Sequence, residues 1–158
     1  MADVVESVDP TPHHLGTVTP RLVVSDGHGA MDFYGRAFGA ETIGEAFSGP
    51  DGGLIHGEMR IGNSVVMITG DPGDGAPARA PDPEVGPCTA IMATYWEDVD
   101  AAWERAIAAG ATVLFPLEDQ FYGERGGRLR DPYGQQWMMS QRIADLSSAE
   151  IRRRATTR

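Results

Sequence analysis

The sequence contains no lysine and only one cysteine, Cys88, in 158 residues. A chain without lysine can form no Schiff base and has no phosphate-binding Walker lysine. A single cysteine can form neither an internal disulfide nor a cysteine metal cluster. No apolar run approaches the roughly 20 residues of a membrane span, and the N-terminus lacks the basic flank of a signal peptide. We therefore expect a cytoplasmic protein with no membrane partner.

Positive charge is also scarce. The 13 arginines are outnumbered by 23 acidic residues, and the formal net charge is −10. Such a chain repels phosphate backbones, so no nucleic-acid partner is expected. The basic cluster Arg152, Arg153, Arg154 and Arg158 is interpreted as the solvated end of a C-terminal helix. Hydrophobic residues still make up 41% of the chain, which is enough to form a core.

Two stretches of the chain repeat one pattern. Residues 19–44 and 88–115 each begin with a short apolar strand and continue, after Asp26 or Asp98, into a helix. Each helix is expected to end at a Gly-Ala pair, where glycine suits the left-handed cap. A strand then resumes, over residues 41–47 in the first copy. The helical residues at core spacing are Phe33, Tyr34, Phe38, Trp103 and Ile107.

Each repeat is followed by a hairpin pattern. In the first hairpin, Gly62-Asn63 is a tight-turn pair between two alternating runs. A two-residue loop there predicts the cross-strand pairs His56 with Thr69, Glu58 with Met67, and Arg60 with Val65. Because side chains two apart share a face of a strand, His56, Glu58 and Arg60 are expected on one face with Met67.

The second hairpin turns at Asp131-Pro132-Tyr133-Gly134, where proline and glycine suit a type I turn. Its longer loop leaves the register open. Either Arg128 faces the same side as Met138, or Arg125 faces the same side as Ser140. We favour the pairing of Arg128 with Met138.

The pattern predicts an α+β fold of two tandem βαβββ modules, over residues 18–70 and 88–141. Residues 71–87, between the modules, are too rich in proline and glycine for regular structure and are interpreted as a linker. Residues 1–17 are expected to form a flexible arm. Residues 142–158 are expected to form a helical tail that starts with a capping box.

Three stretches carry a family resemblance: FYGRAFGAE, HGEMRIGNSVVMITGD, and the long run from EDVDAAW to PYGQQW. Together they resemble the vicinal oxygen chelate superfamily, which contains glyoxalase I, bleomycin-resistance proteins and extradiol dioxygenases. The PhnB-like branch is the most similar, and the resemblance spans residues 18–140. It implies that each module forms a curved mixed sheet, that two sheets enclose a cleft for a small ligand, and that the protein is a homodimer. Whether the modules pair within one chain or between chains stays open.

Metal-using members of that superfamily place four ligands in the cleft. The resemblance puts these positions at or next to Thr19, Met67, Ile91 and Met138, and none of these is a plausible ligand for a divalent ion. A shift of one residue offers no better set. We therefore expect no metal and no other cofactor, so metal-dependent glyoxalase or dioxygenase chemistry is not expected.

The candidate site residues come from the two hairpins and from the loop before the second. His56 and Glu58 are the candidate catalytic pair, which could act as acid and base or only form a polar ladder with Arg60. Phe121 or Tyr122 is expected at the rim, stacked on a flat ligand. The residues expected to bind the ligand are His56, Glu58, Arg60, Met67, Phe121, Tyr122, Arg128 and Met138. His13 and His14 are interpreted as part of the arm, outside the site.

These observations favour a metal-independent small-molecule-binding protein that sequesters an antibiotic or a toxic metabolite. The acidic surface fits a cationic ligand. The alternative is a cofactor-free isomerase, lyase or hydrolase that uses His56 and Glu58 as acid and base in the same cleft. A third hypothesis is a dimeric scaffold with no ligand, because a fold does not fix a function.

Overall fold

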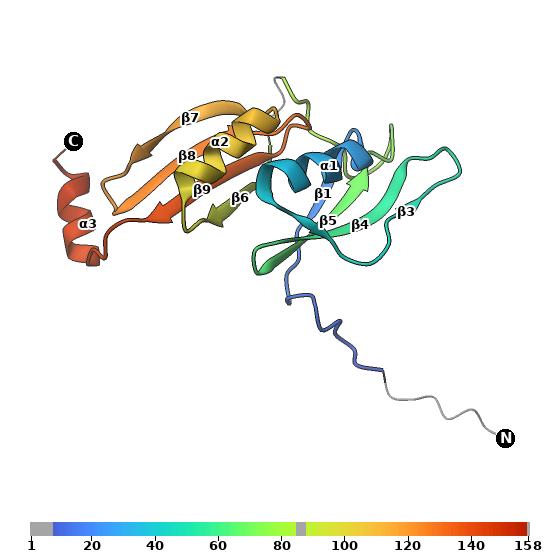
Figure 1. Ribbon diagram of the computed structural model, residues 1–158, viewed down its shortest axis with the longest axis horizontal. Coiled ribbons are helices and arrows are strands. Elements are labelled where there is room, and N and C mark those ends of the chain that lie inside the picture. Colours follow the sequence, from blue (N-terminus) through green and yellow to red (C-terminus); the bar gives the residue numbers. More distant parts are fainter. Residues whose placement is uncertain (1–7, 85–87, 158) are drawn as a thin grey trace.

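The computed structural model describes residues 8–84 and 88–157. Residues 1–7 of the expected arm, residues 85–87 of the expected linker and Arg158 of the basic cluster lie outside the described residues. The described chain forms two mixed sheets of five and four strands, one from each repeat. The sheets lie side by side along the long axis of the molecule (Figure 1). The α+β fold of two tandem modules is confirmed.

The first repeat forms the five-stranded sheet. Its elements are β1 (Arg21–Val24), α1 (Gly27–Phe38), β2 (Glu41–Thr42), β3 (Phe47–Ser48), β4 (Leu54–Ile61) and β5 (Ser64–Gly70). The strands lie in the order β1-β5-β4-β2, and β3 also pairs with β4. β1 is parallel to β5, and the other pairs are antiparallel.

The second repeat forms the four-stranded sheet with the same topology. Its elements are β6 (Ile91–Tyr95), α2 (Val99–Ala109), β7 (Thr112–Asp119), β8 (Glu124–Arg130) and β9 (Gln136–Arg142). The strands lie in the order β6-β9-β8-β7, with β6 parallel to β9. A last helix, α3 (Ser148–Ala155), begins after the N-cap residue Ser147. Among the described residues, no helix combines the length and the apolar character that crossing a membrane requires.

The strand expected over residues 41–47 is interrupted, so this expectation was wrong. Between the end of α1 and the start of β4, the chain pairs with β4 through two strands of two residues each, β2 and β3. Ile43 still donates its backbone N–H to the carbonyl of Glu58 at 2.9 Å. The next residue, Gly44, has a φ of 62°, a left-handed conformation that takes the chain out of the sheet.

Both long helices have the expected boundaries. Asp26 and Asp98 are the N-caps of α1 and α2, and each side chain accepts a hydrogen bond from the backbone N–H three residues on. Gly39 follows α1 with a φ of 64°, and Gly110 follows α2 with a φ of 120°. The two glycines therefore end the helices in conformations that other residues rarely adopt.

The β4–β5 hairpin has the register that the sequence predicts. Gly62-Asn63 joins the strands, and Glu58 lies opposite Met67. Gly62 has a φ of 57°, which explains why a glycine occupies the first position of this loop. Because one slip in register would move every side chain to the other face, this loop decides which residues of β4 face away from α1.

The β8–β9 hairpin has the register favoured from the sequence. Arg128 lies opposite Met138, whereas Arg125 lies opposite Gln141. Arg125 faces the side of the helices, where its guanidinium forms an ion pair with Asp100 of α2 at 2.8 Å. The alternative, in which Arg125 shared a face with Ser140, was wrong.

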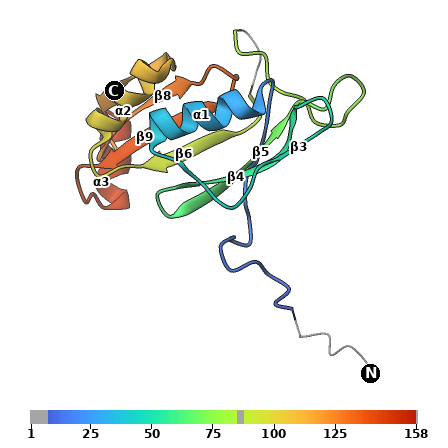
Figure 2. The ribbon, with the colours of Figure 1, turned by 45° about the vertical axis from the view of Figure 1, so that its right-hand side comes forward.

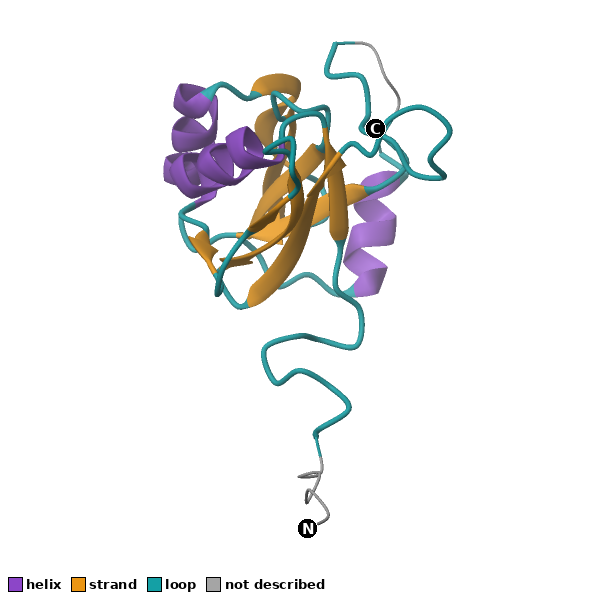
Figure 3. Cartoon of the chain, turned by 90° about the vertical axis from the view of Figure 1, so that its right-hand side faces the viewer, coloured by secondary structure: helices purple, strands orange, loops and turns teal. Residues whose placement is uncertain are grey.

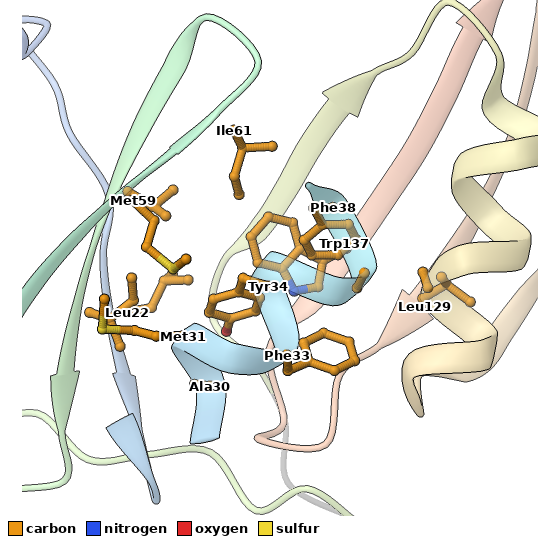
Figure 4. Close-up of a cluster of buried hydrophobic side chains, with 14 of the residues drawn as sticks. Leu22, Ala30, Met31, Phe33, Tyr34, Phe38, Met59, Ile61, Leu129 and Trp137 are labelled. Atoms are coloured by element: carbon orange, nitrogen blue, oxygen red, sulfur yellow. The ribbon is translucent and has the colours of Figure 1, made fainter. Parts of the chain in front are cut away.

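The helices α1 and α2 cover one side of the two sheets, and α3 lies on the other side (Figure 3). The core is formed where α1 packs between the modules. Figure 4 shows Tyr34 and Phe38 of α1 beside Trp137 of β9. The ring centroids of Phe38 and Trp137 are 4.6 Å apart, and both residues are buried. Trp103 is buried as expected, but Ile107 is 41% exposed on the outer side of α2, so that expectation was wrong.

A buried carboxylate joins the two modules. Asp131, which is 2% exposed, accepts hydrogen bonds from the hydroxyl of Tyr34 in α1 at 2.8 Å and from Trp137 Nε1 at 2.9 Å. Its other oxygen accepts the backbone N–H groups of Tyr133 and Gln135, each at 2.9 Å. Burial raises the pKa of Asp131, while these donors act in the opposite direction. The turn of the second module is thus tied to the helix of the first.

Candidate functional site

Each sheet has one face that α1 and α2 leave uncovered. Along β4, β5, β8 and β9, most residues on the helix side are buried, and most residues that alternate with them are partly exposed. The first open face carries Arg21, His56, Glu58, Arg60 and Met67. The second open face carries Ala93, Phe115, Arg128 and Met138. All the site residues predicted from the two hairpins therefore lie on these faces.

The arm before β1 contacts the first open face at His14, whereas its earlier described residues extend away from the sheets (Figure 1). The arm, in blue, passes beside β4 in Figure 2. His14 Nε2 lies 2.6 Å from Glu58 Oε2, and His56 Nε2 lies 3.1 Å from Glu58 Oε1. The side chain of Glu58 is only 16% exposed between the two rings. His14, which the sequence placed outside the site, is therefore part of the polar cluster.

The two histidines change the chemistry of Glu58. Burial by itself raises the pKa of this carboxyl, but the hydrogen bonds from His14 and His56 outweigh burial and lower the pKa below its ordinary value. A carboxylate with a lowered pKa is a weaker general base. Arg60 takes no part in this cluster, since among the described residues the ion pairs of Glu58 are those with the two histidines.

The second open face is organised by one row of residues across four strands. Ala93 of β6, Met138 of β9, Arg128 of β8 and Phe115 of β7 are successive cross-strand neighbours. The guanidinium carbon of Arg128 lies 5.1 Å from the centroid of the Phe115 ring. Phe115 is 58% exposed. The row therefore presents a cation on an aromatic ring to solvent.

Phe121 and Tyr122 lie in the connection between β7 and β8. Their rings meet edge to face, with centroids 5.2 Å apart. Residues 124–127 of β8 separate this connection from Arg128. The structure therefore does not bring the two aromatic residues to the row of Arg128, and their contact with a ligand stays a prediction.

A groove of about 1140 Å³ runs between the modules, and none of the predicted site residues lines it. Its walls are the arm from His14 to Pro20, the tip of the β4–β5 hairpin, and β6 with the turn that follows it. Trp96 lies in this groove and packs on Phe38, with ring centroids 6.0 Å apart. No local pattern predicts this groove, because its walls come from three segments that share no motif.

The sequence of residues 11–139 matches the family model of the Glyoxalase/Bleomycin resistance protein/Dioxygenase superfamily. The chain belongs to this superfamily. The uncharacterized protein Mb0911c of Mycobacterium bovis is 40% identical over 136 residues, which cover 85% of this chain and 88% of that protein. TioX from Micromonospora sp. ML1 is 26% identical with a TM-score of 0.61, over 81% of this chain and 100% of TioX. A PhnB protein from Bacillus cereus shares the fold, with 20% identity and a TM-score of 0.54, over 80% of this chain and 99% of that one.

Metal-using members of the glyoxalase superfamily bind a divalent ion between their sheets. The strand register shows which residues this chain has at the corresponding positions. On the open faces, Arg21 lies beside Met67 and Ala93 lies beside Met138, two residues further along β1 and β6 than the positions expected. A guanidinium, a methyl group and two thioethers do not supply the imidazole and carboxylate ligands that such a site needs. The residues present therefore do not fit a metal centre of this kind.

The histidine–glutamate cluster does not change this result. Among the described residues, no group of three or more histidine, cysteine, aspartate or glutamate side chains is placed so that it could hold a metal ion. In this superfamily member, both imidazoles instead contact the carboxylate of Glu58 itself. The cluster therefore fastens the arm to the sheet.

Replacing Glu58 by glutamine is expected to release the arm, because glutamine keeps the shape but removes the charge that both histidines contact. The backbone ¹⁵N heteronuclear NOE of Leu15 and Gly16 should fall, and a His14→Ala change should have the same effect. His13→Ala is the matched control, since that ring is 90% exposed. An arm that stays ordered in both test variants would contradict this role of the cluster.

The same contact should depend on pH in a defined direction. The pKa of Glu58 is lowered in the folded state. The stabilisation that its carboxylate gives to the docked arm is therefore complete above the ordinary glutamate pKa, and it is lost as the pH falls through the lowered pKa. The NOE of the arm should follow this loss in the natural protein. It should not do so in the Glu58→Gln variant, which has no carboxylate to titrate.

Proposed function

We propose that this protein binds a small molecule without a metal, in a cleft built from its open faces, and thereby sequesters an antibiotic or a toxic metabolite. The observation that carries the proposal is the Arg128–Phe115 pair, which lies on an uncovered sheet face with no acidic partner among the described residues. A large exposed aromatic ring beside an unpaired charge is typical of binding surfaces.

Large apolar side chains are exposed on both sides of the cleft that we propose. On the first sheet, Phe47 lies opposite His56 and is 59% exposed. On the second sheet, Tyr95 of β6 is 63% exposed and Phe115 of β7 is 58% exposed, on the two edge strands of the sheet. A monomer would leave this apolar surface in water, so we propose that the protein is a homodimer in which a second copy closes the cleft.

Ligand binding in this cleft is expected to be independent of metal. Protein purified without added metal should contain far less than one metal ion per chain, because Met67 and Met138 stand where metal-using relatives need stronger ligands. A chelator should leave the ligand-induced thermal shift unchanged. Stoichiometric zinc, nickel, iron or manganese that is lost on Met67→Ala or Met138→Ala would contradict the proposal.

A cofactor-free enzyme is the second candidate, and the hydrogen bond between His56 and Glu58 is the observation that favours it. The contact from His14 argues for binding instead, because it occupies the carboxylate and lowers its pKa. An isomerase, lyase or hydrolase that used this pair would lose turnover in Glu58→Gln while keeping its ligand affinity. A binding protein has no turnover to lose.

A further inference from the structure

The arginines of the strands fall into two groups. Arg125 and Arg142 form ion pairs with aspartates. The other four have no acidic partner among the described residues, and all four belong to strand positions on the open faces: Arg21, Arg60, Arg128 and Arg130. In a chain with a net charge of −10, arginines without acidic partners are unexpected, because carboxylates are abundant. Their gathering on the open faces gives these faces a local charge opposite to that of the whole protein.

Two of the four arginines are used within the chain. Arg21 donates to the carbonyl of Ile55 at 3.3 Å, and Arg130 donates to the carbonyl of Glu84 at 2.7 Å. Arg128 is different. Its Nε is buried with no hydrogen-bond partner, as is the Nε of Arg130, but Arg128 makes no other hydrogen bond to the described residues, and its guanidinium rests on the exposed ring of Phe115. A guanidinium that has no acidic partner within the described chain and lies on an open face is available to bind an acidic group of a ligand.

The acidic residues near Arg128 do not fill this role. Glu118 pairs with Gly126, one row away on the same face. Glu124 lies two rows away and accepts a hydrogen bond from the Tyr95 hydroxyl at 2.8 Å. Neither forms an ion pair with Arg128 within the described chain. The position next to Arg128 toward these residues is a glycine, so no side chain from β8 shields the guanidinium on that side.

The two open faces carry different charges at the position that Arg128 occupies in the repeat. Glu58 lies opposite Met67 in the first hairpin, and Arg128 lies opposite Met138 in the second. The two modules therefore carry opposite charges at equivalent positions. Glu58 is already hydrogen-bonded to His14 and His56, whereas Arg128 has no acidic partner among the described residues. The charge left for a ligand to neutralise is positive.

We infer that the second open face binds a flat aromatic carboxylate, with Arg128 holding the carboxylate and the exposed faces of Phe115 and Met138 supporting the ring. A guanidinium presents parallel N–H donors that match the two oxygens of a carboxylate. This inference rests on the proposed function, because it names the ligand class of the same site. An anionic ligand differs from the cationic ligand that the net charge of the chain suggested. The net charge acts mainly on the rate of encounter, whereas the groups at the site determine the affinity.

The test uses three probes that share one ring system and differ in charge: 2-naphthoate, 2-naphthamide and 2-naphthylmethylammonium. Affinities are measured by titration calorimetry on the full chain. The natural protein should bind naphthoate at least about tenfold more tightly than either of the others, as expected for a charge-assisted bidentate contact. Arg128→Met should remove most of this preference and leave the naphthamide affinity within about twofold.

Two further variants keep the test decisive. Arg128→Lys retains the charge without the planar fork and should give a naphthoate affinity between those of the natural protein and Arg128→Met. Arg152→Met removes an exposed arginine of α3 and should change nothing, which controls for the net charge of the chain. Melting temperatures of all variants show whether a loss of binding reflects a loss of folding.

The outcomes distinguish the inference from the proposed function. If naphthamide or the ammonium probe binds as tightly as naphthoate, or if naphthoate keeps its affinity in folded Arg128→Met, the inferred ligand class is wrong while small-molecule binding stands. If none of the three probes binds the natural protein, both the proposed site and the inferred class are overturned.

Discussion

An Asp131→Ala variant is expected to lose about 3–5 kcal/mol of unfolding free energy, a large effect for a single substitution. Alanine leaves four donors without an acceptor: the Tyr34 hydroxyl, Trp137 Nε1 and two backbone N–H groups. Tyr34 and Trp137 are fully buried, so water cannot replace the lost carboxylate. Urea denaturation of the natural and variant proteins measures the difference directly.

Two control variants define the cause of this effect. Tyr34→Phe removes one of the four hydrogen bonds and should cost about 1 kcal/mol, a fraction of the Asp131→Ala loss. Asp119→Ala removes an exposed carboxylate that contacts Arg125, and it should change stability little. An Asp131→Ala loss below about 1 kcal/mol would show that the buried carboxylate does not hold the two modules together.

The second large effect is expected on the state of association. At tens of micromolar protein, sedimentation equilibrium should give twice the chain mass of 16.9 kDa. Phe47→Glu and Phe115→Glu each place a charge on an exposed apolar part of an open face, so each should shift the protein toward the monomer.

Ile107→Glu is the matched control for association. Ile107 is also an exposed apolar residue, at 41%, but it lies on the outer side of α2. This variant should remain a dimer. A natural protein that sediments as a monomer, or a dimer that both open-face variants leave intact, would contradict closure of the cleft by a second copy.

The first hairpin shows how much of the candidate site follows from local sequence. A two-residue Gly62-Asn63 loop permits one register, and the register decides that Glu58 shares a face with Met67. The second hairpin has a longer loop, so its local sequence permits two registers. The hydrogen bonds of Asp131 to the backbone of Tyr133 and Gln135 fix the turn in the folded chain.

The contacts that the sequence did not predict join residues far apart in the chain. His14 and Glu58 are 44 residues apart, and Tyr34 and Asp131 are 97 apart. The arm has no periodic pattern that would predict its path, so nothing local indicated that His14 returns to β4. A signal did exist for Asp131, because a buried Trp137 indole needs an acceptor for its N–H. From the sequence, Asp131 is interpreted only as a turn residue, so its role as the acceptor for Trp137 is not predicted.

The central claim is that the open faces, and not the groove between the modules, bind a small molecule without a metal. The seven methionines offer a direct test by ¹³C-methyl labelling. Met138 lies on the second open face beside Arg128, and Met67 lies on the first, whereas Met92 lines the groove. The buried methyls of Met31, Met59 and Met139 report on the core.

The deciding measurement is a methyl spectrum of the labelled protein titrated with 2-naphthoate in the presence of EDTA, with 2-naphthamide as a second probe. We expect a saturable shift of the Met138 methyl with at least one of the probes, accompanied by Met67 if the two faces close over the ligand, and little change at Met31, Met59 and Met139. Shifts confined to Met92, or shifts that arise only after zinc is added, would contradict the account.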